Sequence, residues 1–186
     1  MAEEGEAQLT AGARKILAAA SELFYERGIT AVGVDAIAAR SGITKRTLYN
    51  RFGSKDALIV AYLQRRHDQW WTRWEKRIAD APRHRALTAF DSYADDARPA
   101  GRGCAFLNAA AELPGSHPGF AVIRDHKRQV RARLQELIAE EGGHDPAARA
   151  EHVFLLLEGA IAHQGVDGDA KRLTTARRLA EDLLER

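Results

Sequence analysis

Apolar residues recur along the whole chain at spacings of three and four positions, and this periodicity constrains the fold more than any other feature. The stripe formed by Ile16, Ala20 and Leu23 is typical of it. Such spacing gathers side chains on one face of an α-helix, whereas a half-buried strand needs a spacing of two. No convincing alternating segment appears. The sequence therefore predicts an all-α fold.

Glycines, prolines and capping residues divide this pattern into separate helices. Thr10 can cap a first helix, which Gly28 ends. Ser54 can cap a long helix that reaches about Asp80. The other helices are expected near 34–40, 45–51, 83–97, 104–113, 118–141, 146–163 and 169–185. The two helices near 34–40 and 45–51 have the spacing of a helix-turn-helix.

Composition excludes several classes of protein. With 28 basic and 26 acidic residues the net charge is +2, so a histone-like chain is excluded and any affinity for nucleic acid comes from local charge. Cys104 is the only cysteine, which excludes an internal disulfide. We expect neither a bound metal nor a cofactor. No apolar run is long enough to span a membrane, and the acidic N-terminus lacks the features of a secretion signal. We therefore expect a soluble cytoplasmic protein with no membrane contact.

The segment from Arg40 to Lys55 carries the chemistry. It contains five cations and no acidic residue, a local charge of +5. A helix in the major groove can present side chains to base edges while lysine and arginine neutralise phosphates. Leu48 falls on the inward stripe of the second short helix. The residues that we expect to contact DNA are Thr44, Lys45, Arg46, Thr47, Tyr49, Asn50, Arg51 and Lys55.

The order of residues in this region carries a further signal. Its distinctive features are the glycine turn at Gly42, the Thr47-Leu48-Tyr49 step, the aromatic Phe52 and the Ser54-Lys55-Asp56-x-Leu58 opening of the next helix. Over about residues 10–62 the chain closely resembles the DNA-binding signature of the TetR family of bacterial transcriptional regulators. The resemblance implies an all-helical homodimer that binds a palindromic operator on double-stranded DNA and is released by a small-molecule effector.

The resemblance also implies roles for individual residues. It assigns Lys45, Arg46 and Thr47 to bases, Tyr49 and Lys55 to backbone phosphates, and Asn50 and Arg51 to flanking contacts. One departure concerns the start of the preceding helix, where the family commonly has Thr or Ser and this chain reads Val32-Gly33-Val34. A phosphate contact there must use backbone N–H groups. Asp35 should repel phosphate unless it accepts from a cytosine amine or pairs with a nearby arginine.

The expected domain organisation follows from these assignments. Residues 1–8 form a disordered tail, residues 9–53 the helix-turn-helix DNA-binding domain, and residues 54–186 a helical regulatory and dimerisation domain. The resemblance implies that the last of these holds the effector.

The effector site is expected among aromatic and polar residues of the C-terminal helices. An aromatic stripe at helical spacing is more often core, and small residues beside Cys104 can simply allow close helix packing. Glu158 interrupts a very apolar run, so it must find a partner or face water. The candidate ligand residues are Trp70, Trp74, Phe90, Tyr93, Cys104, Asn108, Glu112, Phe154 and Glu158.

The last two helices point to a dimer independently of the resemblance. Residues 153–161 are apolar around the whole helix, and a helix that is apolar on every side needs cover on every side. Pairing these two helices with their copies in a second subunit would form a four-helix interface. The expected interface residues are Phe154, Leu157, Ile161, Leu173, Ala176, Leu179 and Leu183.

Three alternatives belong to other classes. Cys104 could act as a redox-sensing thiol, although its apolar neighbours favour a buried and inert one. The dimer could instead act on a protein partner without binding DNA, which the intact charge of 40–55 disfavours. An enzyme would need Cys104 paired with His117, His126 or His163, and no catalytic motif supports this. We therefore expect a ligand-responsive repressor rather than an enzyme.

Overall fold

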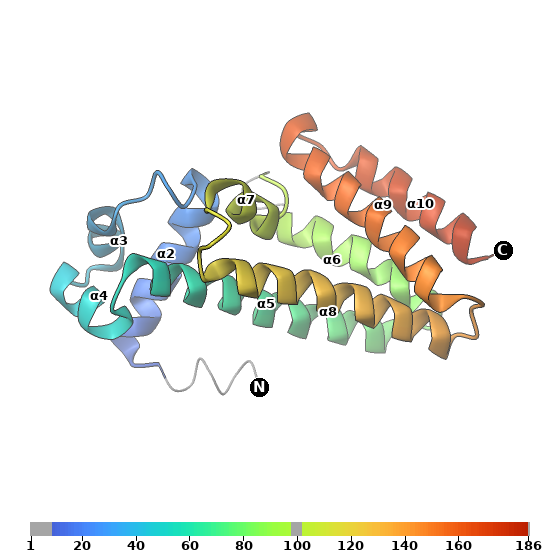
Figure 1. Ribbon diagram of the computed structural model, residues 1–186, viewed down its shortest axis with the longest axis horizontal. Coiled ribbons are helices and arrows are strands. Elements are labelled where there is room, and N and C mark those ends of the chain that lie inside the picture. The colour runs from blue at the N-terminus through green and yellow to red at the C-terminus, as the bar shows by residue number, and fades with distance from the viewer. Residues whose placement is uncertain (1–8, 98–101, 186) are drawn as a thin grey trace. The chain divides into compact units, whose positions relative to one another are not determined.

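The computed structural model describes residues 9–97 and 102–185, and over these residues the chain forms nine α-helices, one short 3-10 turn and no strand (Figure 1). The all-α prediction is confirmed. No helix in the described ranges is both long and apolar enough to cross a lipid bilayer. The predicted tail over residues 1–8 lies outside the described residues. The elements are α2 (Ala11–Arg27), α3 (Val34–Ser41), α4 (Lys45–Phe52), α5 (Lys55–Asp80), η1 (Arg85–Leu87), α6 (Thr88–Ala97), α7 (Ala105–Glu112), α8 (Gly119–Glu140), α9 (Pro146–Asp167) and α10 (Lys171–Leu184).

Two helices differ from their predicted limits for local reasons. The helix expected over 83–97 begins instead as the 3-10 turn η1, whose N-cap His84 adopts a left-handed conformation (φ 51°), and continues as α6 from Thr88. Helix α9 continues four residues past the expected end at 163. It stops at Gly168, which has φ 73° and donates its N–H to the Gln164 carbonyl.

The chain divides into two compact units. The N-terminal unit extends to Gln69 and includes Asn108–Ile123, and the C-terminal unit comprises Trp70–Leu107 and the chain from Arg124 onward. The predicted boundary after residue 53 lies inside the N-terminal unit. The start of α5 belongs there because it packs on α2: the rings of Phe24 and Tyr62 meet edge to face with centroids 5.5 Å apart.

The core of the N-terminal unit fixes the helix-turn-helix. Each of α2, α3, α4 and α5 contributes a fully buried aliphatic side chain, namely Ile16, Ile37, Leu48 and Leu58. Burying each of them contributes about 1.5–3 kcal/mol to folding. Helices α3 and α4 both pack on α2, and each is anchored by a single buried residue, Ile37 or Leu48, so their remaining faces are left for other contacts.

The C-terminal unit has its own core, in which Trp74 is fully buried. The indole Nε1–H of Trp74 donates to Thr88 Oγ1 at 3.0 Å, so its polar atom is satisfied inside the core. Leu134 of α8 and Leu157 of α9 are also fully buried. Helices α9 and α10 lie side by side in this unit (Figure 1).

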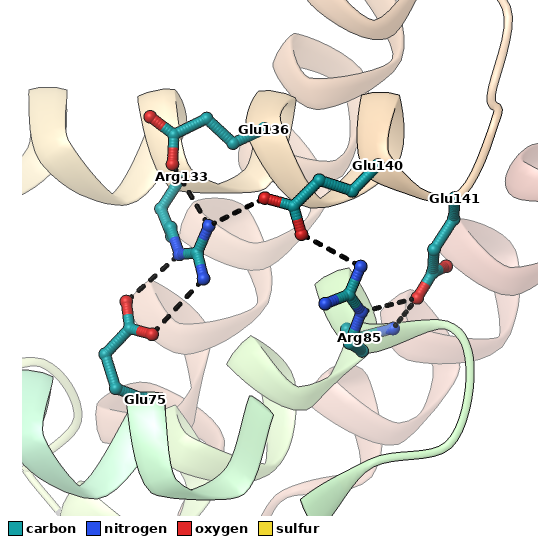
Figure 2. A network of polar contacts seen from close by, with 6 residues as sticks. All are labelled: Glu75, Arg85, Arg133, Glu136, Glu140 and Glu141. Carbon is teal, nitrogen blue, oxygen red and sulfur yellow. Dashed lines mark hydrogen bonds and ion pairs between the residues drawn. The ribbon is translucent and has the colours of Figure 1, made fainter. Parts of the chain in front are cut away.

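An ion-pair network crosses three elements of the C-terminal unit. Figure 2 shows its members, which are Glu75, Arg85, Arg133, Glu136, Glu140 and Glu141. Arg133 donates to both carboxylate oxygens of Glu75, at 3.0 and 3.3 Å, in the two-bond geometry that suits a guanidinium. Glu140 accepts from Arg133 at 3.3 Å and contacts Arg85 at 2.9 Å. The network thus ties α8 to α5 and to η1.

Replacing Arg133 by alanine is expected to lower the free energy of unfolding by about 1–2 kcal/mol, because three carboxylates lose their shared cation. The matched control is Arg131→Ala, which removes one exposed pair with Glu151 and should cost less than about 1 kcal/mol. Urea denaturation followed by circular dichroism measures both. Equal losses in the two variants would contradict a role for the network.

Candidate nucleic-acid interface

Helix α3, the turn after it and helix α4 form the predicted helix-turn-helix. Gly42 adopts the left-handed conformation (φ 67°) that the sharp turn requires. Thr44 caps α4: its Oγ1 accepts the Thr47 N–H at 3.2 Å and lies 2.9 Å from Thr47 Oγ1. The turn predicted at Gly42 is confirmed, and the hydroxyl groups of Thr44 and Thr47 are used within the helix start.

Helix α4 has one buried side and one exposed side. Leu48 is fully buried, as the inward stripe predicts, whereas the Tyr49 ring is 42% exposed. Thr47 is half-buried. The other predicted contact residues of this segment are all exposed, namely Thr44, Lys45, Arg46, Asn50 and Arg51. The helix therefore offers a polar and cationic surface, and burial of Leu48 fixes the direction in which that surface faces.

Not every cation of this segment is free to meet phosphate. Arg40 donates to Glu22 of α2 at 2.8 Å, and the hydrogen bond and charge of Glu22 raise the Arg40 pKa. Lys45 contacts Asp35 of α3 at 2.9 Å, and its pKa is raised by the hydrogen bond and charge of Asp35. Within the described residues, Arg46 and Arg51 have no acidic partner. These two arginines carry the uncompensated charge of α4.

Lys55 lies in a place that the sequence did not reveal. Its ammonium donates to the Ile29 carbonyl at 2.8 Å and sits 6.0 Å from the centre of the Phe24 ring. In this arrangement it holds the turn between α2 and α3, and its contact with a backbone phosphate stays a prediction. The Ile29 carbonyl lies 26 positions earlier in the chain and offers the Lys55 ammonium a half-buried acceptor.

The start of α3 agrees with the departure noted in the sequence. Gly33 is the N-cap residue and provides no side-chain cap. Asp35 in the first turn pairs with Lys45, so its partner is a lysine rather than the arginine considered from sequence. This pair places one carboxylate beside the recognition surface of α4.

The C-terminal unit contains a small cavity of about 10 Å³, which is room for about one water molecule. Three of the predicted ligand residues, Trp70, Tyr93 and Cys104, line it. The full lining comprises Trp70, Tyr93, Asp96, Ala97, Gly103, Cys104, Phe106, His126 and Ile161.

The other predicted ligand residues are not part of the cavity lining. Trp74 and Phe90 are buried in the helical core, and Phe154 is half-buried on α9. Asn108 and Glu112 belong to the N-terminal unit, because the second half of α7 packs there.

Sequence reasoning missed two aromatic residues of the lining. The rings of Phe106 and His126 stack with centroids 3.8 Å apart, and Trp70 meets His126 edge to face. The helical phase of α7 could have drawn attention to Phe106 beside Cys104. No local pattern marks His126, since its neighbour comes from a different helix.

Glu158 finds its partner beside the cavity. Its Oε1 accepts from Lys127 Nζ at 2.8 Å and from the Tyr93 hydroxyl at 3.2 Å, and Lys127 Nζ also lies 3.5 Å from Cys104 Sγ. Burial acts to lower the Lys127 pKa, but Cys104 and Glu158 outweigh it and raise that pKa. Burial, followed by the charge of Glu158, raises the Tyr93 pKa well above its ordinary value. Lys127 is thus charged and Tyr93 neutral at physiological pH.

Raising the pH above about 10 is expected to destabilise the fold through this cluster. Tyr93 ionises at its ordinary pKa of about 10 in the unfolded chain but stays protonated in the native one, so the unfolded state is favoured as pH rises. Urea denaturation at pH 8 and 10.5 measures the effect. The free energy of unfolding of Tyr93→Phe should fall less between these two pH values than that of the wild-type chain. An equal fall in both proteins would contradict the role of Tyr93 ionisation.

Comparison with known proteins identifies the family. Residues 16–62 match the sequence pattern described as "Bacterial regulatory proteins, tetR family". The chain is 31% identical to SCO4454, a TetR-family transcriptional regulator from Streptomyces coelicolor, with 94% of each chain covered and a TM-score of 0.86. The chain belongs to the TetR family. It is therefore a helix-turn-helix DNA-binding transcriptional regulator, and this family is not one of enzymes.

Two curated relatives extend the comparison. The chain is 24% identical over 177 residues to the HTH-type transcriptional regulator YjdC of Escherichia coli, with 91% of each protein covered. It is 50% identical over 54 residues to the HTH-type transcriptional activator FasR of Mycolicibacterium smegmatis, a match that spans 29% of this chain and 25% of FasR.

The residues predicted to form the subunit interface of this TetR-family chain fall into two groups. Four of them, Leu157, Ile161, Leu173 and Ala176, are buried inside the C-terminal unit, because α9 and α10 pack on each other and on α6. Of the remainder, Leu179 is 47% exposed, while Phe154 and Leu183 are half-buried. Leu155 and Val166, which were not predicted, are 59% and 79% exposed.

Replacing Asp35 by asparagine is expected to tighten the binding of this TetR-family regulator to all DNA sequences by about 3- to 10-fold at 0.1 M salt. The variant removes a carboxylate beside α4 and releases Lys45 for a phosphate contact. The dependence of log affinity on log salt should become steeper by about 0.9 for each new contact. Fluorescence anisotropy at several salt concentrations measures this. Glu136→Gln controls for net charge, and identical behaviour of the two variants would contradict the prediction.

Proposed function

We propose that this regulator is a homodimeric repressor that binds a palindromic operator through α4 and is released by a small-molecule effector. The observation that carries the proposal is the surface of α4. Leu48 anchors the helix in the core, while Arg46 and Arg51 are exposed and, within the described part of the chain, lack an acidic partner. Arginine is the side chain that most often reads guanine in the major groove.

The dimer is proposed from the exposed side of α9 and α10. A shallow surface groove runs between these helices, and its apolar lining includes Leu155, Leu156, Gly159 and Leu179. Leucines that are half exposed on adjacent helices favour burial against a second copy. The interface thus uses the outer residues of α9 and α10, and the buried residues Leu157 and Leu173 support it from within.

The effector is proposed to bind at the cavity of the C-terminal unit. The cavity has room for about one water, so an organic effector requires a more open state. A ligand that binds the open state more tightly shifts the population toward it. A 100-fold reduction in operator affinity needs about 2.7 kcal/mol of differential binding.

The sign of regulation and the location in the cell are parts of the proposal. We propose repression by occupancy of the operator, and a cytoplasmic location because the chromosome lies there. FasR is named as an activator, so the sign needs its own measurement. A reporter gene placed behind the operator should be silenced by the wild-type chain and released by Arg46→Ala. A reporter that is switched on by the wild-type chain would reverse the sign.

Selection from a pool of random-sequence duplexes tests the DNA-binding part of the proposal. The purified chain should enrich an inverted repeat whose half-sites are one helical turn, or a multiple of it, apart. Gel-shift assays with the enriched duplex should show two chains bound to each duplex. Failure to enrich any sequence would overturn the proposal and favour a regulator that acts on a protein partner.

A thiol-sensing regulator is the second candidate, and the contact of Cys104 with Lys127 favours it. Cys104 Sγ lies 3.5 Å from the Lys127 ammonium, although the thiol itself is buried. An adjacent cation can stabilise a thiolate, which is the reactive form. Titration of operator binding with an oxidant tests this candidate against Cys104→Ser. Equal sensitivity of the two proteins would eliminate it.

A further inference from the structure

Glu112, the last residue of α7, makes a specific contact with the turn that leads into the helix-turn-helix. Its Oε2 accepts the Thr30 backbone N–H at 2.8 Å and the Thr30 hydroxyl at 2.7 Å. Both partners belong to the N-terminal unit although 82 positions separate them in sequence. A carboxylate that accepts two hydrogen bonds from one residue fixes both the backbone and the side chain of that residue.

The turn at residues 28–30 is shaped for this carboxylate. Gly28 adopts φ 94°, and a Cβ atom there would lie 3.0 Å from both oxygens of Glu112. Lys55 makes a second contact with the same turn, because its ammonium donates to the Ile29 carbonyl at 2.8 Å. Two consecutive residues, Ile29 and Thr30, are thus held by one base from α5 and one acid from α7. This short connection of α2 to α3 therefore has little freedom to move while both contacts persist.

A second contact joins the same segment to the start of α5. His117 is buried, its Nδ1 accepts the Gly119 N–H at 2.9 Å, and its Nε2 lies 3.4 Å from an Asp56 carboxylate oxygen. The segment from Asn108 to Ile123 thus contacts the N-terminal helices at the 28–30 turn and at the beginning of α5. Both points adjoin the helices that carry the recognition surface.

Helix α7 also takes part in the C-terminal unit. Its first residues, Ala105 to Leu107, belong to that unit, and Phe106 together with the preceding Cys104 lines the cavity. The helix is eight residues long. A hydrogen-bonded helix of two turns moves as a rigid element, so a displacement at its start is transmitted to its end.

We infer that Glu112 is a positioning residue that couples the state of the cavity to the helix-turn-helix. This inference rests on the proposed function. When the cavity is closed, α7 places the Glu112 carboxylate on Thr30 and holds α3 and α4 in the DNA-binding arrangement. When an effector opens the cavity, α7 withdraws Glu112, the 28–30 turn is released, and operator affinity falls.

Coupling between two sites is reciprocal, which allows a test without a known effector. Operator DNA should favour the closed cavity and thereby protect Cys104, which is 8% exposed and is the only cysteine of the chain. The rate of its reaction with the chromogenic disulfide DTNB therefore reports cavity opening. In the wild-type chain, saturating amounts of the selected operator duplex should slow this reaction at least about 5-fold.

A set of variants distinguishes a loss of coupling between operator and cavity from a general loss of fold stability. Glu112→Ala should bind the operator about 10-fold more weakly and, once saturated with it, should show less than about 2-fold protection of Cys104. Glu112→Gln keeps one acceptor oxygen for Thr30 and should give an intermediate effect. Thr30→Val, which removes only the hydroxyl donor, is the second probe in case Glu112→Ala unfolds. Glu151→Ala, which removes an exposed carboxylate of α9, is the control and should retain full protection.

The outcomes are distinguishable. Loss of protection in Glu112→Ala with retained operator binding supports the inference. Equal protection in Glu112→Ala and in the wild-type chain overturns it, as does the absence of protection in a wild-type chain that binds the operator. A wild-type chain that binds no duplex in the gel-shift assay overturns the proposed function itself.

Discussion

Replacing Arg46 by alanine is expected to weaken operator binding by about 1–3 kcal/mol, or about 5- to 150-fold, and to relax base preference at one position of each half-site. Arg46 lies in the first turn of α4, is exposed and, among the residues described, has no acidic partner. Its loss therefore removes a contact with DNA and leaves no buried group unpaired. Gel-shift titration with the selected operator and with its single-base variants measures the effect.

The matched control for Arg46→Ala is Arg40→Ala. This substitution removes the same charge from the same segment, but Arg40 is bound to Glu22 and is not expected to read DNA. Its operator affinity should stay within about 3-fold of the wild-type value. An equal loss in both variants would show that net charge, rather than a specific contact of Arg46, determines affinity.

Replacing Lys127 by alanine is expected to lower the free energy of unfolding by about 3–5 kcal/mol, because it leaves the Glu158 carboxylate without its cation in a buried setting. The side chains of both residues are only 16% exposed, and their charged atoms are 2.8 Å apart. Removing both charges together in the double variant Lys127→Met and Glu158→Gln should recover most of the loss. Urea denaturation of the single and double variants measures this coupling.

An exposed ion pair of the same unit provides the control. Lys171 pairs with Asp169 at 3.0 Å, but the Lys171 side chain is 88% exposed. Lys171→Ala should therefore change the free energy of unfolding by less than about 0.5 kcal/mol. A comparably small loss in Lys127→Ala would contradict a structural role for the Lys127 and Glu158 pair.

The sequence predicted those features that depend on neighbouring positions. Helical phase alone places Leu48 inward, and the structure finds it fully buried with Tyr49 exposed. The turn at Gly42 and the cap at Thr44 also follow from residue type and spacing. Such features are local, because a single turn of helix determines them.

Contacts between distant segments could not be predicted in the same way. Lys55 binds the Ile29 carbonyl, and a backbone acceptor leaves no mark in the sequence. Glu112 is a predicted ligand residue, yet the structure pairs it with Thr30, which lies 82 positions away in the sequence. Leu157 is predicted at a subunit interface because its run is apolar all round, and the sequence does not show that α10 and α6 cover part of α9 within one subunit.

We propose that two copies of α4 engage one duplex through phosphate and base contacts. The experiment is a titration of the selected operator duplex, followed by sedimentation velocity at several salt concentrations. We predict two chains on each duplex and an affinity that falls about 10³- to 10⁵-fold between 50 and 200 mM salt, as expected for six to ten phosphate contacts. One chain on each duplex, or an affinity that does not change with salt, would contradict the account.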